Sequence, residues 1–168
     1  REKFKEISEK ENIQNQLYAL TTITTYDSTY DKICIIIDRD VNSFSEEQYQ
    51  NAIKLSEENN FILGISNPCF EFFLLMHIHD MSDFSNDDIL ENKKEQEKTL
   101  MERILDKRLK EEIGTSFKKR NYDVKYFIEN IDKGIENSKL YQFENHKLIN
   151  EVGTSVFTIL DEILESQS

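Results

Sequence analysis

The sequence predicts an α/β fold, with a partly parallel sheet flanked by helices and a helix-rich C-terminal half. Two short apolar runs, Lys32–Asp38 and Phe61–Ser66, have the length and the β-branched content of strands. A helical pattern separates them, and strand, helix and strand in this order form a right-handed unit with parallel strands. Glycine and proline are scarce, four and one in 168 residues, which favours helices with few tight turns.

The first strand is the most apolar stretch of the chain, and a charged helical pattern at Glu2–Ala19 precedes it. A run of this kind is typical of a strand buried on both faces by helices. After it, Ser45 and Gln48 have the spacing of a capping box, in which each side chain bonds the backbone of the other residue. We therefore expect a helix from Ser45 to about Asn59.

The only proline of the chain follows the second strand, in Ser66-Asn67-Pro68-Cys69-Phe70-Glu71. Proline is tolerated in the first turn of a helix, so we expect Asn67 to be the N-cap. The helix that follows is apolar nearly all round as far as His77, which predicts that it is buried. Cys34 and Cys69 both lie in apolar runs and are expected to be reduced core residues.

The C-terminal half has three further helical patterns. We expect an amphipathic, charged helix over Glu95–Ile113 that stops at Gly114, a second over Tyr122–Leu140, and a last one from about Thr154. No repeat or low-complexity linker divides the chain, so residues 1–168 are expected to form a single domain. Arg1 is not a methionine, which is consistent with a fragment of a longer protein.

The charge balance limits the function classes. A net charge of −12 argues against a passive nucleic-acid binder, which needs a basic surface. An acidic protein can still act on nucleic acid if a divalent cation or a basic partner neutralises it, and the alternative is that acidity serves solubility. No apolar stretch approaches the roughly 20 residues needed to span a bilayer. We therefore expect a cytoplasmic protein with no membrane association.

Asp38 and Asp40 follow the first strand, where open α/β sheets bind their ligands. Residues two apart on an extended chain point the same way, so both carboxylates can converge on one cation. Mg²⁺ is the expected ion, because it prefers oxygen ligands and often takes one or two carboxylates with water and phosphate; Mn²⁺ is the alternative. In the plainer interpretation, Asp38 ends the strand and Asp40 caps the next turn.

Three further positions are candidates for the same site. Glu71 lies in the first turn of its helix and faces the same edge as Asp38, although charge–dipole stabilisation would also explain it. His77 is six residues further on and off the face of Glu71, so a hydrogen bond in the core is the expected role. The basic triplet Lys118–Arg120 could meet phosphate, or it could be a solvated surface. There is no Gly-rich phosphate loop and no G-x-S-x-G elbow.

The run Ile35-Ile36-Ile37-Asp38-Arg39-Asp40, followed by Ser66-Asn67-Pro68-Cys69-Phe70-Glu71-Phe72-Phe73-Leu74-Leu75-Met76-His77, resembles the RloB family, also called AbiL-type abortive infection proteins. The family pattern is an apolar strand ending in FDRD and then SNPCFELWLLLHF. Weaker similarities are Phe117-Lys118-Lys119, Ile135–Lys139 and the closing helix from Asn150 to Leu164, where Glu151 replaces a proline.

The resemblance implies a Toprim-like domain of a bacterial anti-phage system that works with an ATPase partner. It implies that Asp38 and Asp40 hold magnesium, that Glu71 is a third ligand or a base, and that Lys119 stabilises phosphate charge. Asn67 and His77 are then supporting residues beside the ligands. The family's first strand, with its E-G-x-x-T-E glutamate, has no counterpart here, so that carboxylate is either lost or belongs to a segment outside this chain.

Three functions follow as expectations. The first is a Mg²⁺-dependent nuclease that cleaves nucleic-acid phosphodiesters in abortive infection. Whether several copies of the chain assemble into a homo-oligomer is not determined by the sequence. The second is a non-catalytic regulatory module that docks on the ATPase through the charged helix Glu95–Ile113. The third is a phosphatase of the haloacid dehalogenase type with Asp38 as nucleophile and Asp40 as acid, against which Asn42 counts because that motif prefers Thr or Val.

Overall fold

The computed structural model describes residues 31–40 and 44–165. Its contacts divide the chain into two compact units, Arg1–Ile33 and Cys34–Ser168, and the description below concerns the second. The helix expected over Glu2–Ala19 lies outside the described residues, and a single domain over the whole chain stays a prediction.

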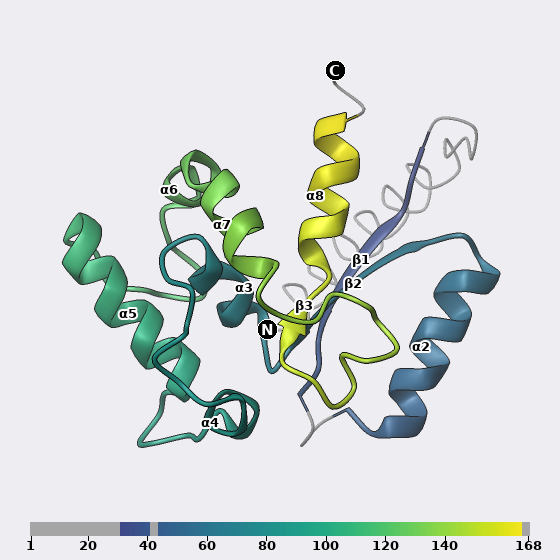
Figure 1. The fold of residues 1–168 in the computed structure, drawn as a ribbon, viewed down its shortest axis with the longest axis horizontal. Helices are drawn as coiled ribbons and strands as arrows, with labels where there is room; N and C mark the ends of the chain where they lie inside the picture. The colour runs from purple at the N-terminus through teal and green to yellow at the C-terminus, as the bar shows by residue number, and fades with distance from the viewer. Residues whose placement is uncertain (1–30, 41–43, 166–168) are drawn as a thin grey trace, which may run out of the picture. The chain divides into compact units, whose positions relative to one another are not determined.

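The described sheet has three strands in the order β1 (Cys34–Asp38), β2 (Ile62–Asn67) and β3 (Gly153–Thr154). β1 and β2 are parallel, with Cys34 opposite Ile62 and Asp38 opposite Ser66, whereas β3 pairs antiparallel with β2. The chain is therefore α/β as predicted, and β1 and β2 end side by side at the same edge (Figure 1). This edge positions the candidate site.

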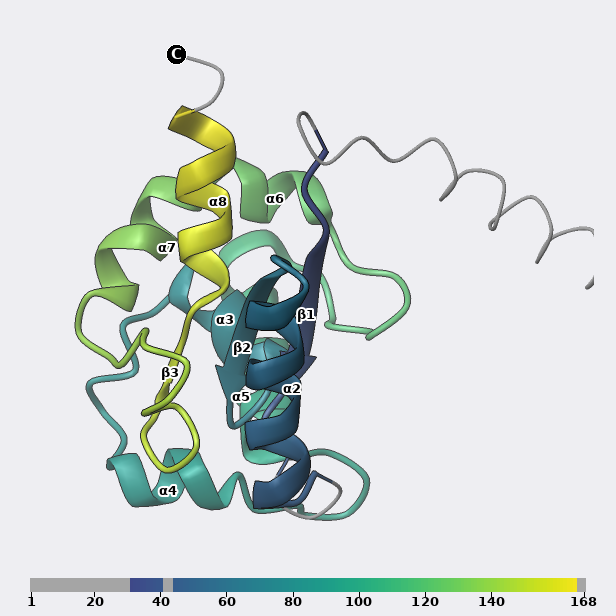
Figure 2. The ribbon, with the colours of Figure 1, turned by 90° about the vertical axis from the view of Figure 1, so that its right-hand side faces the viewer.

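Helices pack on both faces of β2, as Figure 2 shows for α2 (Glu46–Glu58) and α8 (Val156–Glu165). The capping box of Ser45 and Gln48 is confirmed and begins α2. A core on the α2 side is formed by buried apolar side chains of the helix, the strand and a later loop: Tyr49, Ile53, Leu63, Ile65, Leu148 and Ile149. On the α8 side the contact is close, because a Cβ at Gly64 would lie 2.7 Å from Ile159 Cδ1.

The prediction that the first strand is buried on both faces is wrong. Ile35 and Ile36 are 36% and 49% exposed, and Cys34 is exposed as well, whereas Cys69 is buried as expected. The reason is that β1 is the outer strand of the described sheet, while α2 and α8 pack mainly over β2. An apolar composition alone does not distinguish an outer strand from a central one.

The larger core surrounds α3 (Phe70–Met76), which is buried as predicted and contacts α5 (Leu100–Ile113) and α7 (Ile131–Ser138). Asn67 is not its N-cap, because it is the last residue of β2 and Cys69 occupies the cap position. The side-chain amide of Asn67 instead donates to the carbonyls of Leu148 and Glu151, at 2.7 and 3.1 Å. Pro68 therefore precedes the helix and does not lie in its first turn.

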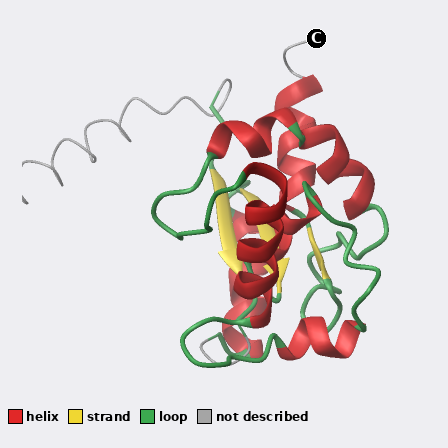
Figure 3. Cartoon of the chain, turned by 90° about the vertical axis from the view of Figure 1, so that its left-hand side faces the viewer, coloured by secondary structure: helices red, strands yellow, loops and turns green. Residues whose placement is uncertain are grey.

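The remaining helices, drawn in red with the others in Figure 3, differ from the predicted bounds at the start of α5, in the middle of residues 122–140 and at the start of the last helix. The segment before α5 forms a short helix, α4 (Asn86–Glu91), and α5 itself begins at Leu100 behind the cap residue Thr99. Gly114 ends α5 with a left-handed φ of 71°, as expected. The helix predicted over residues 122–140 breaks at Asn130 into α6 (Val124–Glu129) and α7, and the last helix begins after β3.

Within the described ranges, no helix has the length and the apolar character that crossing a bilayer requires.

Candidate functional site at the carboxyl ends of the strands

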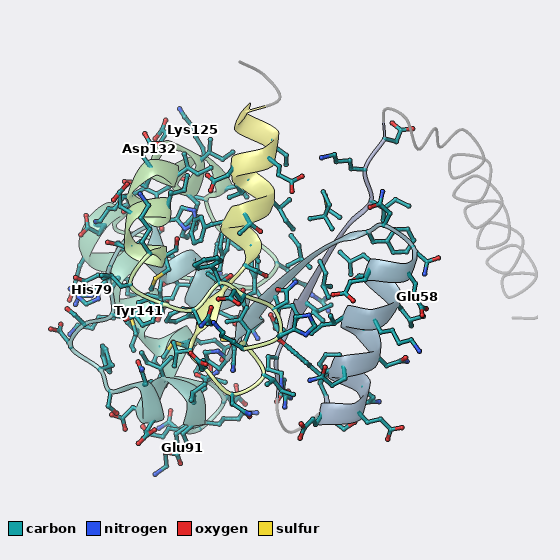
Figure 4. All side chains as sticks on the ribbon, turned by 45° about the vertical axis from the view of Figure 1, so that its right-hand side comes forward. Glu58, His79, Glu91, Lys125, Asp132 and Tyr141 are labelled. Atoms are coloured by element: carbon teal, nitrogen blue, oxygen red, sulfur yellow. The ribbon has the colours of Figure 1, made fainter. Side chains whose placement is uncertain are left out.

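A pocket of about 360 Å³ lies where β1 ends and α3 begins. It brings together four residues that the sequence singled out, Asp38, Asp40, Glu71 and Lys119. Its other lining residues follow β1, connect β2 to α3, or lie at the end of α4 and in the segment before α5: Arg39, Pro68, Cys69, Leu90, Glu91, Asn92, Lys94 and Thr99. Glu91, labelled in Figure 4, belongs to the α4 side of this pocket.

Asp38 is the last residue of β1 and accepts a hydrogen bond from the backbone N–H of Phe70, the first residue of α3. It is accessible to solvent, yet the surrounding protein removes part of its hydration, and this desolvation raises the pKa of its carboxyl. The negative charge of Glu71 raises the pKa further, and that of Asp40 adds a smaller effect, while Lys119 opposes them. Asp38 therefore carries charge that its neighbours do not fully compensate.

Glu71 is only 6% exposed, and its Oε1 lies 3.1 Å from Nζ of Lys119. It also accepts a hydrogen bond from the thiol of Cys69, whose pKa is raised well above its ordinary value, first by burial and then by the charge of Glu71. Cys69 is accordingly a neutral donor and not a thiolate nucleophile. Among the described residues, Glu71 thus pairs with one cation and one thiol.

Lys119 forms ion pairs with two carboxylates, because its Nζ also lies 3.0 Å from Oε1 of Glu102. Desolvation lowers the pKa of Lys119, but the hydrogen bond to Glu102 and the charge of Glu71 outweigh it and raise the pKa above its ordinary value. The loop that carries the lysine is fixed at Phe117, whose ring is buried and whose N–H donates to Asp106 at 2.9 Å. This anchor places Lys119 over the pocket.

Glu102 is a functional candidate that sequence reasoning missed. Its Oε2 accepts the Thr99 N–H at 2.7 Å, and its own N–H donates to the Thr99 hydroxyl at 3.3 Å, which is a complete capping box. Desolvation raises its pKa, but the Thr99 and Lys119 hydrogen bonds outweigh this effect and lower it. The Thr99-x-x-Glu102 spacing was visible in the sequence as a helix start, but no sequence signal linked it to Lys119.

Arg39, between the two aspartates, is also part of the pocket lining and was not predicted to be. It is 6% exposed, it donates to the Phe44 carbonyl at 2.6 Å, and its guanidinium lies 5.2 Å from the centre of the Tyr49 ring. These contacts direct the Arg39 side chain toward Phe44 and Tyr49, on the α2 side.

The other candidates lie elsewhere. Asn67 turns toward Leu148 and Glu151, as described above. His77 is 2% exposed, its Nδ1 lies 3.1 Å from the Phe73 carbonyl, and its ring packs against three phenylalanines: Phe73, Phe127 and Phe157. Lys118 lines a separate surface pocket, and Arg120 lines neither that pocket nor the one with the carboxylates. Of the basic triplet, then, Lys119 alone lines the carboxylate pocket.

The carboxylates of the pocket supply some, but not all, of the ligands that a hard divalent cation such as Mg²⁺ requires. In the part of the chain that the structure describes, no three His, Cys, Asp or Glu side chains are placed to hold a metal ion together. Asp38 and Asp40 offer oxygen ligands, and Mg²⁺ commonly takes one or two carboxylates and completes its shell with water and phosphate. Glu71 lines the same pocket, and its Oε1 is paired with Lys119.

The comparisons with known proteins give one match. A family model described as RloB-like protein matches residues 2–163, which is nearly the whole chain. No curated protein and no solved structure matches it significantly.

Proposed function

This chain belongs to the RloB-like family, and on that premise we propose that it is a metal-dependent nuclease of a bacterial anti-phage, abortive infection system. The proposed reaction is cleavage of a nucleic-acid phosphodiester with Mg²⁺ or Mn²⁺. One observation carries the chemistry: Asp38, Asp40, Glu71 and Lys119 line a single pocket although they come from three separate segments of the chain. A Toprim-like site and an ATPase partner of the same system are parts of this proposal.

Asp38 and Asp40 are the residues that would hold the cation, since the charge of Asp38 is not fully compensated by its neighbours. A bound divalent ion supplies positive charge to the phosphate and to the leaving oxygen. Glu71 serves as a further ligand or as a base, and Lys119 places a positive charge where the phosphate enters. Glu102 holds Lys119 in position.

The test is the double variant Asp38→Asn with Asp40→Asn, incubated with Mg²⁺ and labelled duplex DNA, single-stranded DNA and transfer RNA. We expect cleavage to fall to the level of buffer and cellular toxicity to disappear, because neutral amides bind Mg²⁺ far more weakly than carboxylates do. The matched control is Glu58→Gln with Asp132→Asn, which removes the same charge from α2 and α7, outside the pocket (Figure 4). Cleavage that survives in the aspartate variant contradicts the proposal.

A second function is favoured by a different observation. Lys119 forms ion pairs with both Glu71 and Glu102, so the protein itself balances part of the negative charge at the pocket. This arrangement suits a non-catalytic module that regulates an ATPase by docking through the charged face of α5, where Arg108 and Lys107 pair with Glu111. Calorimetry with Mg²⁺ separates the two functions, since only the nuclease needs binding that depends on Asp38 and Asp40.

A further inference from the structure

We propose that the loop between α5 and α6 forms a nucleotide subsite beside the carboxylate pocket, and that the ligand of this subsite is single-stranded nucleic acid. Lys118 contacts a phosphate of the strand, and one unpaired base enters the surface pocket next to it. We call this second pocket the loop pocket; it is lined by Thr115, Ser116, Lys118, Asn121, Tyr122 and Asp123. The assignment rests on the proposed function, because it names the substrate class of the same site.

The distribution of unpaired positive charge is the first observation. Most cations that the structure describes form ion pairs with carboxylates, as Lys107 and Arg108 do with Glu111. Within the described ranges, the exposed cations without an ion pair are Lys93, Lys94, Lys118, Arg120 and Lys133. All but Lys133 belong to the two segments that also supply Lys94 and Lys119 to the carboxylate pocket. An acidic chain therefore keeps its uncompensated cations beside the candidate site, where phosphates would bind.

The loop that carries Lys118 is anchored, although most of its side chains are exposed. Phe117 is buried, and its N–H donates to Asp106 at 2.9 Å. The Asn121 N–H donates to the Lys118 carbonyl at 2.9 Å, which closes the turn, and the rings of Phe117 and Tyr122 lie 5.6 Å apart. A loop that is already ordered loses less conformational entropy when a ligand binds. These contacts therefore favour a binding role for the loop.

Two consecutive lysines of this loop line different pockets. Lys119 lines the carboxylate pocket, and Lys118 lines the loop pocket, which has a volume of about 530 Å³. Because consecutive Cα atoms are only about 3.8 Å apart, the two pockets are neighbours. One strand can therefore place a phosphate at Lys119 and the adjoining nucleotide at Lys118.

The side chains of the loop pocket suit an unpaired nucleobase. Tyr122 supplies an aromatic ring, and Ser116 and Asn121 supply hydrogen-bond donors and acceptors. Asp123, the carboxylate in this lining, is held in place because it caps α6 and accepts the Tyr126 N–H at 3.3 Å. The bases of a duplex are stacked and paired and cannot enter such a pocket, whereas those of a single strand are free to do so.

The experiment is fluorescence anisotropy of the full 168-residue chain in EDTA at low salt. The labelled probes are an oligothymidylate, an abasic strand of the same length and a duplex of the same length, and we expect the oligothymidylate to bind most tightly. Lys118→Gln should weaken its binding roughly threefold and reduce the slope of log affinity against log salt by about 0.7. Tyr122→Leu keeps an apolar side chain beside Phe117 but removes the ring, so it should weaken the oligothymidylate roughly fivefold and leave the abasic strand unchanged.

Lys133→Gln is the matched control, because it removes the same charge from an exposed position on α7 that lines neither pocket. We expect it to change each affinity by less than about twofold, and urea denaturation checks that every variant is folded. Equal effects of the two lysine variants, or a duplex or abasic strand that binds as tightly as the oligothymidylate, overturn the assignment and leave the proposed cleavage standing. Absence of binding by every probe overturns the assignment as well, and it overturns the proposed function too if Mg²⁺-dependent cleavage is also absent.

Discussion

Asp38 at the end of β1 and Asp106 on α5 are both carboxylates partly enclosed by protein, but their surroundings differ. Asp106 accepts from Nζ of Lys110 at 2.8 Å, from Nζ of Lys98 at 3.1 Å and from the Phe117 N–H at 2.9 Å. Desolvation raises its pKa, but these donors outweigh that effect and lower it. Asp38 accepts from one backbone N–H, faces the charge of Glu71, and has a raised pKa.

The difference separates a structural carboxylate from a candidate functional one. Asp106 has three donors, and one of them, the Phe117 N–H, fixes the loop that leads to Lys119. Asp38 keeps a charge that the protein does not balance, which costs stability unless a ligand relieves it. A carboxylate with several donors therefore indicates a structural role. A carboxylate with few donors at the end of a strand indicates a role in binding a ligand.

The largest effect that the comparison predicts is on stability. Asp106→Ala leaves the buried Phe117 N–H without its acceptor and removes the partner of two lysines. We expect the free energy of unfolding to fall by about 2 to 3 kcal/mol, measured by urea denaturation. Asp132→Ala on the exposed side of α7 is the control and should change it by less than about 0.5 kcal/mol. A loss below about 1 kcal/mol in Asp106→Ala would mean that the network is not structural.

A buried titratable group at the other end of α3, His77, extends the comparison. Desolvation lowers the pKa of His77, and its hydrogen bonds to the backbone oppose this only in part. The unfolded chain then binds a proton more readily, so stability is complete above about pH 6.5 and falls as the pH drops below it.

We expect the free energy of unfolding of the unchanged protein, measured by urea denaturation, to fall between pH 7 and pH 5.5, with a slope of at most about 1.4 kcal/mol per pH unit from this one group. In His77→Gln that part of the slope should vanish, although the variant is less stable at pH 7. An identical pH dependence in the two proteins would show that His77 does not titrate on unfolding.

The smallest predicted effect is that of Asp38→Asn on the free energy of unfolding, and its sign is opposite to that of Asp106→Ala. Because folding raises the pKa of Asp38, its ionised form at neutral pH favours the unfolded chain. Asp38→Asn should therefore raise the free energy of unfolding slightly, by roughly 0.5 kcal/mol at pH 7. Urea denaturation at pH 7 measures it, and a clear loss of stability in Asp38→Asn would remove the distinction between the two aspartates.

Local chemistry in the sequence was enough to predict several elements. The capping box at Ser45 and Gln48 and the stop at Gly114 are confirmed, because each depends on residues close together in sequence. The parallel pair β1 and β2 is confirmed as well, because a strand, a helix and a strand in this order favour parallel pairing. Asn67 was misassigned because its donors pair with carbonyls more than 80 residues away, at Leu148 and Glu151. No local pattern records such a partner.

The sequence alone determined that two aspartates follow an apolar strand and that a glutamate follows the next, since parallel strands place their carboxyl ends together. Tertiary structure decided which strand is outermost, which left Ile36 exposed, and which lysine of the triplet reaches Glu71. It also brought in Glu102, whose local role is to cap α5. The reason is that charge pairing depends on distance in space, and the packing of α3 against α5 sets that distance.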